Sequence, residues 1–205
     1  MRTSTRTAPV AASALALALA LTACNDSGSS SGKSRGSSGS QASGSGTSDD
    51  GKQTFRLGEA SPEQESDMKA SSGAKYTVTP TKVQTGTKAD MANSGLEEDK
   101  EDGPQIPVYV WSTLTHKSGK AMELGDMDDD LVIRTDKGRR TRALLVLMGE
   151  AKWPNCPAPD GQKKVNAGQS EKICTAFLIP EGQKAAAVEL TQGFYKEPLE
   201  WPVKN

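Results

Sequence analysis

The sequence predicts an all-β fold, an antiparallel β-sandwich of about seven strands, over residues 76–205. Short runs of β-branched and aromatic residues recur in this region, and Gly and Pro turn signals separate them. The region also holds two cysteines at a spacing suited to a disulfide. No stretch of helix length shows a clear 3.6-residue period of apolar residues. Together these patterns indicate packed sheets rather than a helical domain.

The first two strands are predicted over residues 75–79 and 106–116. Along the second strand one face is aliphatic, with Ile106, Val108, Val110 and Leu114. Alternation then places Tyr109 and Trp111 on the opposite face. In a two-layer sandwich that face points toward solvent, so these aromatic residues mark a candidate partner surface. The alternative is that Arg and Lys stems, or the segment before Tyr76, cover them.

A β-hairpin is predicted over residues 131–148. Its first arm is residues 131–135, and Gly138 provides a turn residue that tolerates a left-handed backbone. Its second arm, residues 142–148, is apolar on both faces, which is typical of a central strand.

Residues 149–172 contain three prolines and are predicted to form a long loop. Three further strands follow, over residues 174–179, 185–190 and 199–203. Pro202 restricts the last of them to a sheet edge, because proline lacks the N–H that a central strand donates. An alternative is a helical domain in which residues 185–188 form a helix turn.

Residues 1–23 have the three parts of a secretory signal peptide. Arg2 and Arg6 supply positive charge, and the Ala/Leu-rich run of residues 10–21 is too short to cross a bilayer. The segment ends in Leu-Thr-Ala before Cys24, which resembles the lipobox of bacterial lipoproteins. The resemblance implies that the Cys24 thiol carries lipid, such as palmitate, and anchors the mature chain at the extracytoplasmic face of the cell membrane. The alternative is an ordinary signal peptide with a cysteine near the cut.

The segment after the signal, residues 24–75, is predicted to be a disordered Gly/Ser-rich tether. Residues 25–51 are mostly Ser, Gly, Thr, Asp, Asn and Gln and hold too little apolar surface to offset the entropy lost on ordering. Residues 52–75 remain polar, and the helix start at Ser61 has no apolar stripe after it. The predicted domains are therefore residues 1–23, 24–75 and 76–205.

The charge balance gives no electrostatic footprint for nucleic acid. Removal of residues 1–23 takes away two basic residues and no acidic one, which leaves a net charge of −3 from 23 basic and 26 acidic residues. With Cys24 lipidated, Cys156 and Cys174 remain as an even pair 18 residues apart. In an exported protein they are expected to form a disulfide, worth about 3 kcal/mol. The alternative, two ligands of a metal site, needs more Cys or His than this chain holds.

No catalytic, cofactor or metal residues are predicted. His116, the only histidine, lies in a Lys/Ser/Gly stretch and reads as a solvated turn residue. Asp126, Asp128 and Asp130 have the spacing of a calcium loop, but the Gly and the bidentate Glu of that loop are replaced by Leu131 and Lys137. A tight calcium site at Asp126–Asp130 is therefore not expected, and a looser one stays open. The acidic run of residues 97–102 is expected to be a mobile loop.

The lipobox, the tether and the Cys-Thr-Ala-Phe-Leu-Ile-Pro-Glu-Gly stretch of residues 174–182 resemble actinobacterial surface lipoproteins. The exported part of those proteins is an immunoglobulin-like sandwich of the telokin-like, immunoprotective extracellular antigen type, a domain of unknown function. The resemblance covers residues 76–203 and implies an immunoglobulin-like fold.

The function predicted from these observations is that of a lipid-anchored, monomeric binding module without catalysis. It would attach to the membrane through its lipid and bind an envelope protein or a small ligand. The alternatives are a small envelope hydrolase and a structural or metal-binding spacer protein. An exposed aromatic patch would favour the binding module, whereas clustered polar residues in a pocket would favour the enzyme.

Overall fold

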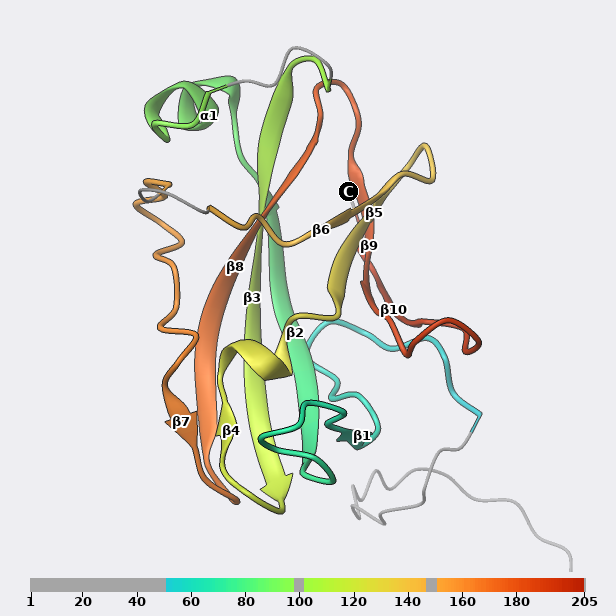
Figure 1. Ribbon diagram of the computed structural model, residues 1–205. Helices are drawn as coiled ribbons and strands as arrows, with labels where there is room; N and C mark the ends of the chain where they lie inside the picture. Colours follow the sequence, from blue (N-terminus) through green and yellow to red (C-terminus); the bar gives the residue numbers. More distant parts are fainter. Residues whose placement is uncertain (1–50, 98–101, 147–150, 205) are drawn as a thin grey trace, which may run out of the picture. The chain divides into compact units, whose positions relative to one another are not determined.

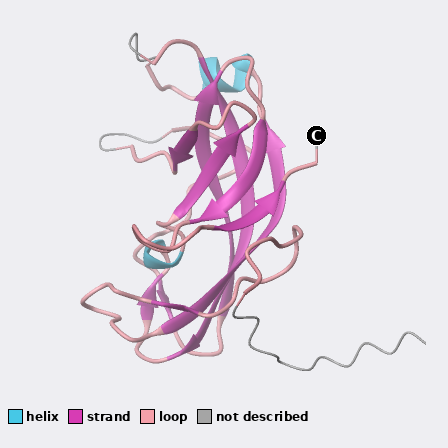
Figure 2. Ribbon diagram, turned by 90° about the vertical axis from the view of Figure 1, so that its right-hand side faces the viewer, coloured by secondary structure: helices cyan, strands magenta, loops and turns pink. Residues whose placement is uncertain are grey.

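The computed structural model describes residues 51–97, 102–146 and 151–204 (Figure 1). These residues form ten strands and only two short helical segments, α1 (Lys88–Asn93) and the 3₁₀ turn η1 (Gly125–Met127). Figure 2 shows how small the helical part is. Among the described residues, no helix is both long and apolar enough to cross a membrane. The predicted all-β class is confirmed.

Two antiparallel four-stranded sheets make up the sandwich. The first has the order β1-β2-β3-β8, formed by Gln64–Glu65, Lys75–Thr85, Gln105–Ser118 and Ser170–Pro180. The second has the order β10-β9-β5-β6, formed by Leu199–Pro202, Ala185–Leu190, Leu131–Thr135 and Arg140–Arg142. A small third sheet pairs β4 (Met122–Glu123) with β7 (Lys164–Val165). Residues 185–190 are thus a strand, which excludes the helical alternative.

The core lies between the two large sheets and follows the alternation of β3. Val108, Val110 and Leu114 are fully buried in it, and Ile106 packs against its edge, as the sequence predicts. The largest contributions from the other strands are Phe177 of β8 and Trp201 of β10, both without exposed surface. Burial of such side chains is the main stabilising term of a domain of this size.

The folded unit begins earlier than the predicted boundary at residue 76. Phe55 is buried, and its ring centroid lies 5.4 Å from that of Trp201. The Trp201 indole N–H donates to the carbonyl of Glu59 at 3.0 Å, and β1 pairs with β2. The part of the predicted tether from residue 51 to residue 75 is therefore folded onto the sandwich. It has no periodic pattern because backbone hydrogen bonds and one aromatic ring hold it. Residues 1–50, with Cys24, lie outside the described residues.

The second hairpin arm also differs from its prediction. β6 ends at Arg142 and is an edge strand of its sheet rather than a central one. The chain then crosses to the other sheet, where Ala143 forms a bridge with Phe177 and the Leu144 N–H donates to the carbonyl of Ala176 at 2.9 Å. The run is apolar on both faces because it leaves one sheet and lies against the other. Residues 147–150 fall outside the described residues.

The predicted edge position of the last strand is confirmed. β10 lies at the end of its sheet and pairs only with β9 among the described strands. Pro202, opposite Ala187, is the last residue of that pairing. A proline is tolerated there because no further strand requires its missing N–H.

Candidate functional site

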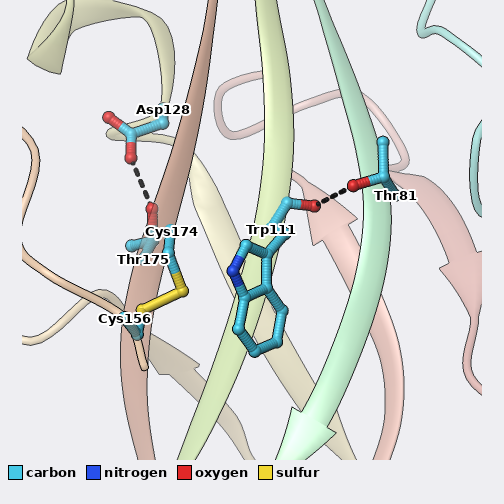
Figure 3. The surroundings of a disulfide bond; sticks show 6 residues. All are labelled: Thr81, Trp111, Asp128, Cys156, Cys174 and Thr175. Carbon is cyan, nitrogen blue, oxygen red and sulfur yellow. Dashed lines mark hydrogen bonds between the residues drawn. A yellow bond between two sulfur atoms is a disulfide. The ribbon is translucent and has the colours of Figure 1, made fainter. Parts of the chain in front are cut away.

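The predicted disulfide joins the loop after β6 to the outer face of the first sheet. Cys156 and Cys174 are bonded with their Cα atoms 5.1 Å apart, within the range of about 4.4–6.8 Å found in disulfides. Cys174 lies on β8, and both cysteines are buried (Figure 3). The bond therefore holds the proline-rich loop against this face of the sandwich.

That loop covers Tyr109, one of the two residues predicted to mark an exposed partner surface. Tyr109 is on the outer face of β3, as alternation requires, but only 4% of it is exposed. Its ring lies 5.7 Å from the ring of Trp153 in the loop, and Met91 of α1 belongs to the same cluster. Burial first, and Asp90 second, raise the pKa of Tyr109 to about 12. The prediction of a solvent-facing Tyr109 is therefore wrong, because the disulfide-anchored loop occupies the place of a partner.

Trp111 is half-buried, and a lysine contacts its ring. Its ring lies 6.2 Å from that of Tyr109, edge to face. The Lys82 ammonium sits 4.2 Å from the Trp111 ring centroid, a distance typical of a cation–π contact. Thr81 donates its hydroxyl to the Trp111 carbonyl at 3.0 Å (Figure 3). Trp111 therefore contacts its own sheet neighbours and also keeps exposed surface, so a role of Trp111 in partner binding stays a prediction.

A pocket of about 770 Å³ opens beside the disulfide. Its volume falls in the range of about 300–1,000 Å³ that is typical of small-molecule sites. Its walls come from the segment after β6, the proline-rich loop and β8, and are mainly apolar: Ala143, Leu144, Leu145, Trp153, Pro157 and Ala176. Leu145 is 78% exposed although it is aliphatic. The apolar run that the sequence assigns to a central strand is thus a pocket wall.

Asp128 forms the polar end of this pocket. Thr175 of β8 donates its hydroxyl to the Asp128 carboxylate at 2.9 Å (Figure 3). Burial raises the pKa of Asp128 to about 6, the hydrogen bond from Thr175 opposes this shift, and Asp129 adds to it. The carboxyl therefore changes between a hydrogen-bond donor and a pure acceptor near pH 6.

The acidic stretch 126–130 does not gather its carboxylates around one point. Asp128 lines the pocket beside the disulfide, whereas Asp126 and Asp130 line a different pocket on the other side of η1. Among the residues that the structure describes, no three His, Cys, Asp or Glu side chains are grouped so as to hold a metal ion. The expectation that no tight calcium site exists here remains a prediction.

His116 is not the solvated turn residue that the sequence indicates. It is fully buried, because β3 continues to Ser118 and places His116 on the same inward face as Leu114. Its Nδ1 lies 2.9 Å from the carbonyl oxygen of Val165, and its Nε2 lies 2.9 Å from that of Ser118. A backbone carbonyl oxygen lies at each ring nitrogen of His116. His116 therefore ties β3 to β7 and is not available to a nucleophile.

An ion-pair network on the outer face of the second sheet was not foreseen from the sequence. Glu189 of β9 is 1% exposed, and its carboxylate lies 2.6 Å from Nε of Arg134 and 2.6 Å from Nε of Arg140. Arg134 also bonds Glu200 at 2.7 Å. Hydrogen bonding to Glu189 raises the pKa of both guanidinium groups. Glu189 is a charged residue inside an otherwise apolar strand, and the predicted hairpin carries arginines, Arg134 and Arg140 among them. This combination could have predicted the network.

No protein-family model matches this sequence, and no curated protein matches it at a significant level. One similar solved structure is that of MPT63, a secreted protein from Mycobacterium tuberculosis. The similarity covers 73% of this chain and 96% of that protein, with 12% sequence identity and a TM-score of 0.48.

Proposed function

We propose that this protein is a lipid-anchored binding module of the bacterial cell envelope, and that the pocket beside the disulfide binds its ligand. The ligand is a small, mainly apolar molecule with one polar group. The observation that carries the proposal is the combination in one pocket of mainly apolar walls and the partly buried carboxyl of Asp128, whose pKa is raised.

The pocket chemistry sets what the ligand must look like. Trp153, Leu144 and Pro157 offer flat apolar walls that favour an aromatic or aliphatic body. Asp128 and Thr175 together present a hydroxyl and a carboxyl to the polar group of the ligand. Below about pH 6 the neutral Asp128 can donate to a carbonyl, and above it the carboxylate accepts from an N–H or O–H.

The extracytoplasmic location is supported by two independent features of the chain. The Cys156–Cys174 disulfide fits an oxidising compartment outside the cytoplasm. The tripartite segment that ends at Cys24 has the form of a lipoprotein signal. Lipid attachment at Cys24 would keep the binding pocket close to the membrane on a tether of residues 25–50.

A small envelope hydrolase is the second candidate, and one observation favours it. A carboxyl with its pKa raised to about 6 next to a pocket is suited to general acid–base catalysis. The buried His116 cannot assist, since both of its ring nitrogens already contact carbonyl oxygens. Release of nitrophenol from nitrophenyl esters or glycosides, lost in Asp128→Asn, would favour the hydrolase over the binding module.

The ligand test uses N-phenyl-1-naphthylamine, an uncharged apolar dye whose fluorescence rises in apolar sites. We expect saturable binding by the mature chain and at least about tenfold weaker binding by Leu145→Asp, which places a charge on the exposed pocket wall without entering the core. Phe194→Asp is the matched control, because it makes the same kind of change at an exposed residue outside this pocket. Equal binding by both variants and the unchanged protein would reject the pocket.

The anchor is tested separately with Cys24→Ala. Without the thiol no lipid can be attached, so the protein should move from the membrane fraction to the medium. The dye should still bind this variant, because Cys24 does not line the pocket. Unchanged membrane retention would contradict lipid anchoring while leaving the pocket proposal in place.

A further inference from the structure

A second pocket, of about 680 Å³, lies on the other side of η1 from the disulfide. Three segments form its walls: residues 63–68, 125–130 and 191–196. Side-chain hydrogen bonds join them, since Gln192 donates to Gln64 at 2.9 Å and Thr191 donates to the Asp130 carboxylate at 3.0 Å. The pocket is thus held by contacts between segments far apart in the sequence.

The walls of this second pocket are strongly acidic. They carry one lysine, Lys196, against six carboxylates: Glu63, Glu65, Asp67, Asp126, Asp129 and Asp130. Glu63 lies 3.9 Å from the ammonium of Lys75, and within the described part of the chain the other five carboxylates form no ion pair. Like charges gathered without counter-charges repel one another and favour a cationic occupant.

The side chain of Tyr76 lines the same pocket, and its hydroxyl has no partner there. Tyr76 of β2 is 6% exposed, and its hydroxyl forms no hydrogen bond with any residue that the structure describes. Burial raises its pKa to about 12, and the nearby aspartates, Asp130 first, add to the shift. The ring is buried while the hydroxyl remains accessible in the pocket, so the hydroxyl is free to bond a polar group of an occupant. The phenol oxygen can accept from an N–H while its proton is donated to a carboxylate.

Two adjacent aromatic side chains stand next to the pocket in the β9–β10 loop. Phe194 and Tyr195 do not line the pocket themselves, but they lie in the chain between Gly193 and Lys196, which do, and both are fully exposed. Exposed aromatic residues next to each other are typical of binding hot spots on protein surfaces. An acidic pocket beside them opposes adsorption to an anionic lipid surface, because the charges have the same sign. A protein partner therefore fits this surface better than a membrane does.

We propose that this acidic pocket is a docking site for a basic segment of a partner protein. A Lys or Arg side chain enters the pocket, its N–H groups donate to the carboxylates and to the Tyr76 oxygen, and apolar residues beside it pack on Phe194 and Tyr195. This site goes beyond the proposed function, because it differs in ligand chemistry from the pocket beside the disulfide and shares with it only the wall at Gly125 and Asp129.

The test measures fluorescence anisotropy of a labelled peptide, Gly-Leu-Lys-Leu-Lys-Leu-Gly amide, at about 50 mM salt, where charges are little screened. The protein is the mature chain with Cys24→Ser, which carries the tether and the whole described domain. The control probe is the same peptide with both lysines acetylated, which keeps the apolar residues and removes the charges. We expect the acetylated peptide to bind at least about tenfold more weakly.

Three variants separate the parts of the site. Asp67→Asn with Asp129→Asn removes two exposed pocket charges, and Phe194→Ser with Tyr195→Ser removes the two exposed aromatic rings; each pair should weaken binding about fivefold. Tyr76→Phe removes only the hydroxyl and should weaken it about threefold. The matched control, Glu97→Gln with Asp102→Asn, removes two exposed charges near α1, at the opposite end of the sandwich from β1 (Figure 1), and should change binding less than about twofold.

Several results would overturn the proposal. One is equal binding of the acetylated and the unmodified peptide, and another is unchanged binding by the Asp67/Asp129 pair. Binding of calcium by this pair of carboxylates in place of the peptide would make the pocket a cation site. Attachment to lipid vesicles that needs Phe194 and Tyr195, with no peptide binding, would make these aromatic residues a membrane contact.

Discussion

The outer faces of the two sheets are covered by different chemistry. On the first sheet, a disulfide-anchored loop packs aromatic and apolar side chains over Tyr109 and Trp111. On the second sheet, Arg134 and Arg140 lie over the buried carboxylate of Glu189. In both cases other side chains shield the outer face of a sheet from water. On the first sheet they cover aromatic rings, and on the second they neutralise a buried carboxylate.

The difference between the two faces has a functional consequence. The pocket beside the disulfide lies between the loop that Cys156 anchors, the segment after β6 and β8. Ion pairs between neighbouring strands instead join charged side chains directly across the second sheet. We therefore expect changes on the first face to affect the proposed ligand site and changes on the second face to affect stability alone.

The largest effect should come from the charged face. In Arg134→Met with Arg140→Met, the buried Glu189 loses both counter-charges, so we expect a loss of about 3–5 kcal/mol in the free energy of unfolding. Urea unfolding followed by circular dichroism measures it. Lys88→Met, which breaks the exposed pair with Glu181, is the control and should cost less than about 1 kcal/mol. A loss below that value in the double variant would show that Glu189 does not depend on its partners.

The second-largest loss of stability should come from removal of the disulfide that anchors the loop. Cys156→Ala with Cys174→Ala removes a cross-link over 18 residues and should lower the free energy of unfolding by about 3 kcal/mol. The same variant should lose the naphthylamine dye, because the loop no longer forms a wall. Thermal melting and dye titration measure the two effects. A destabilised variant that keeps full dye binding would separate the pocket from the disulfide.

The free energy of unfolding should depend on pH through Asp128, which lines the pocket beside the disulfide. Asp128 has a pKa of about 6 when folded against an ordinary value of 3.8, so the folded state binds the proton more readily. Its contribution is complete below about pH 4 and is lost as the pH rises through 6, on the order of 2–3 kcal/mol. The measurement is the difference in unfolding free energy between the protein and Asp128→Asn from pH 4 to 8. A difference that does not change with pH would contradict the burial of this carboxyl.

The smallest effect should come from the lysine over Trp111. Lys82→Ala removes an exposed cation–π contact and should cost about 0.5–1 kcal/mol. Lys82→Arg keeps the positive charge over the ring and should retain most of that stability. Urea unfolding of the unchanged protein and the two variants measures these stabilities. Equal losses in the Ala and Arg variants would show that a positive charge over the ring does not itself stabilise the fold.

Much of the fold was predictable because strand alternation is a local property. The inward face of β3 follows from a period of two, and so does the position of Tyr109 and Trp111 on the other face. The pairing of Cys156 with Cys174 followed from counting, because the predicted lipidation of Cys24 leaves two cysteines. The edge position of β10 followed from Pro202, whose missing N–H is a property of the residue itself.

Tertiary structure decided what lies against each strand, and the site depends on that. Exposure of Tyr109 could not be read from alternation, since the loop that covers it is distant in sequence and is brought back by a disulfide. His116 and Glu189 are polar residues buried by strand length and sheet pairing, and each has at least one partner on another strand.

The acidic pocket is the feature that the sequence was least able to predict. Its carboxylates come from two segments that each look like an ordinary solvated turn, in a chain whose net charge is close to zero. Composition and local pattern determine which residues form strands, because backbone geometry is local. Only the folded chain determines which charges, rings and hydroxyls meet, because those contacts join residues far apart in the sequence.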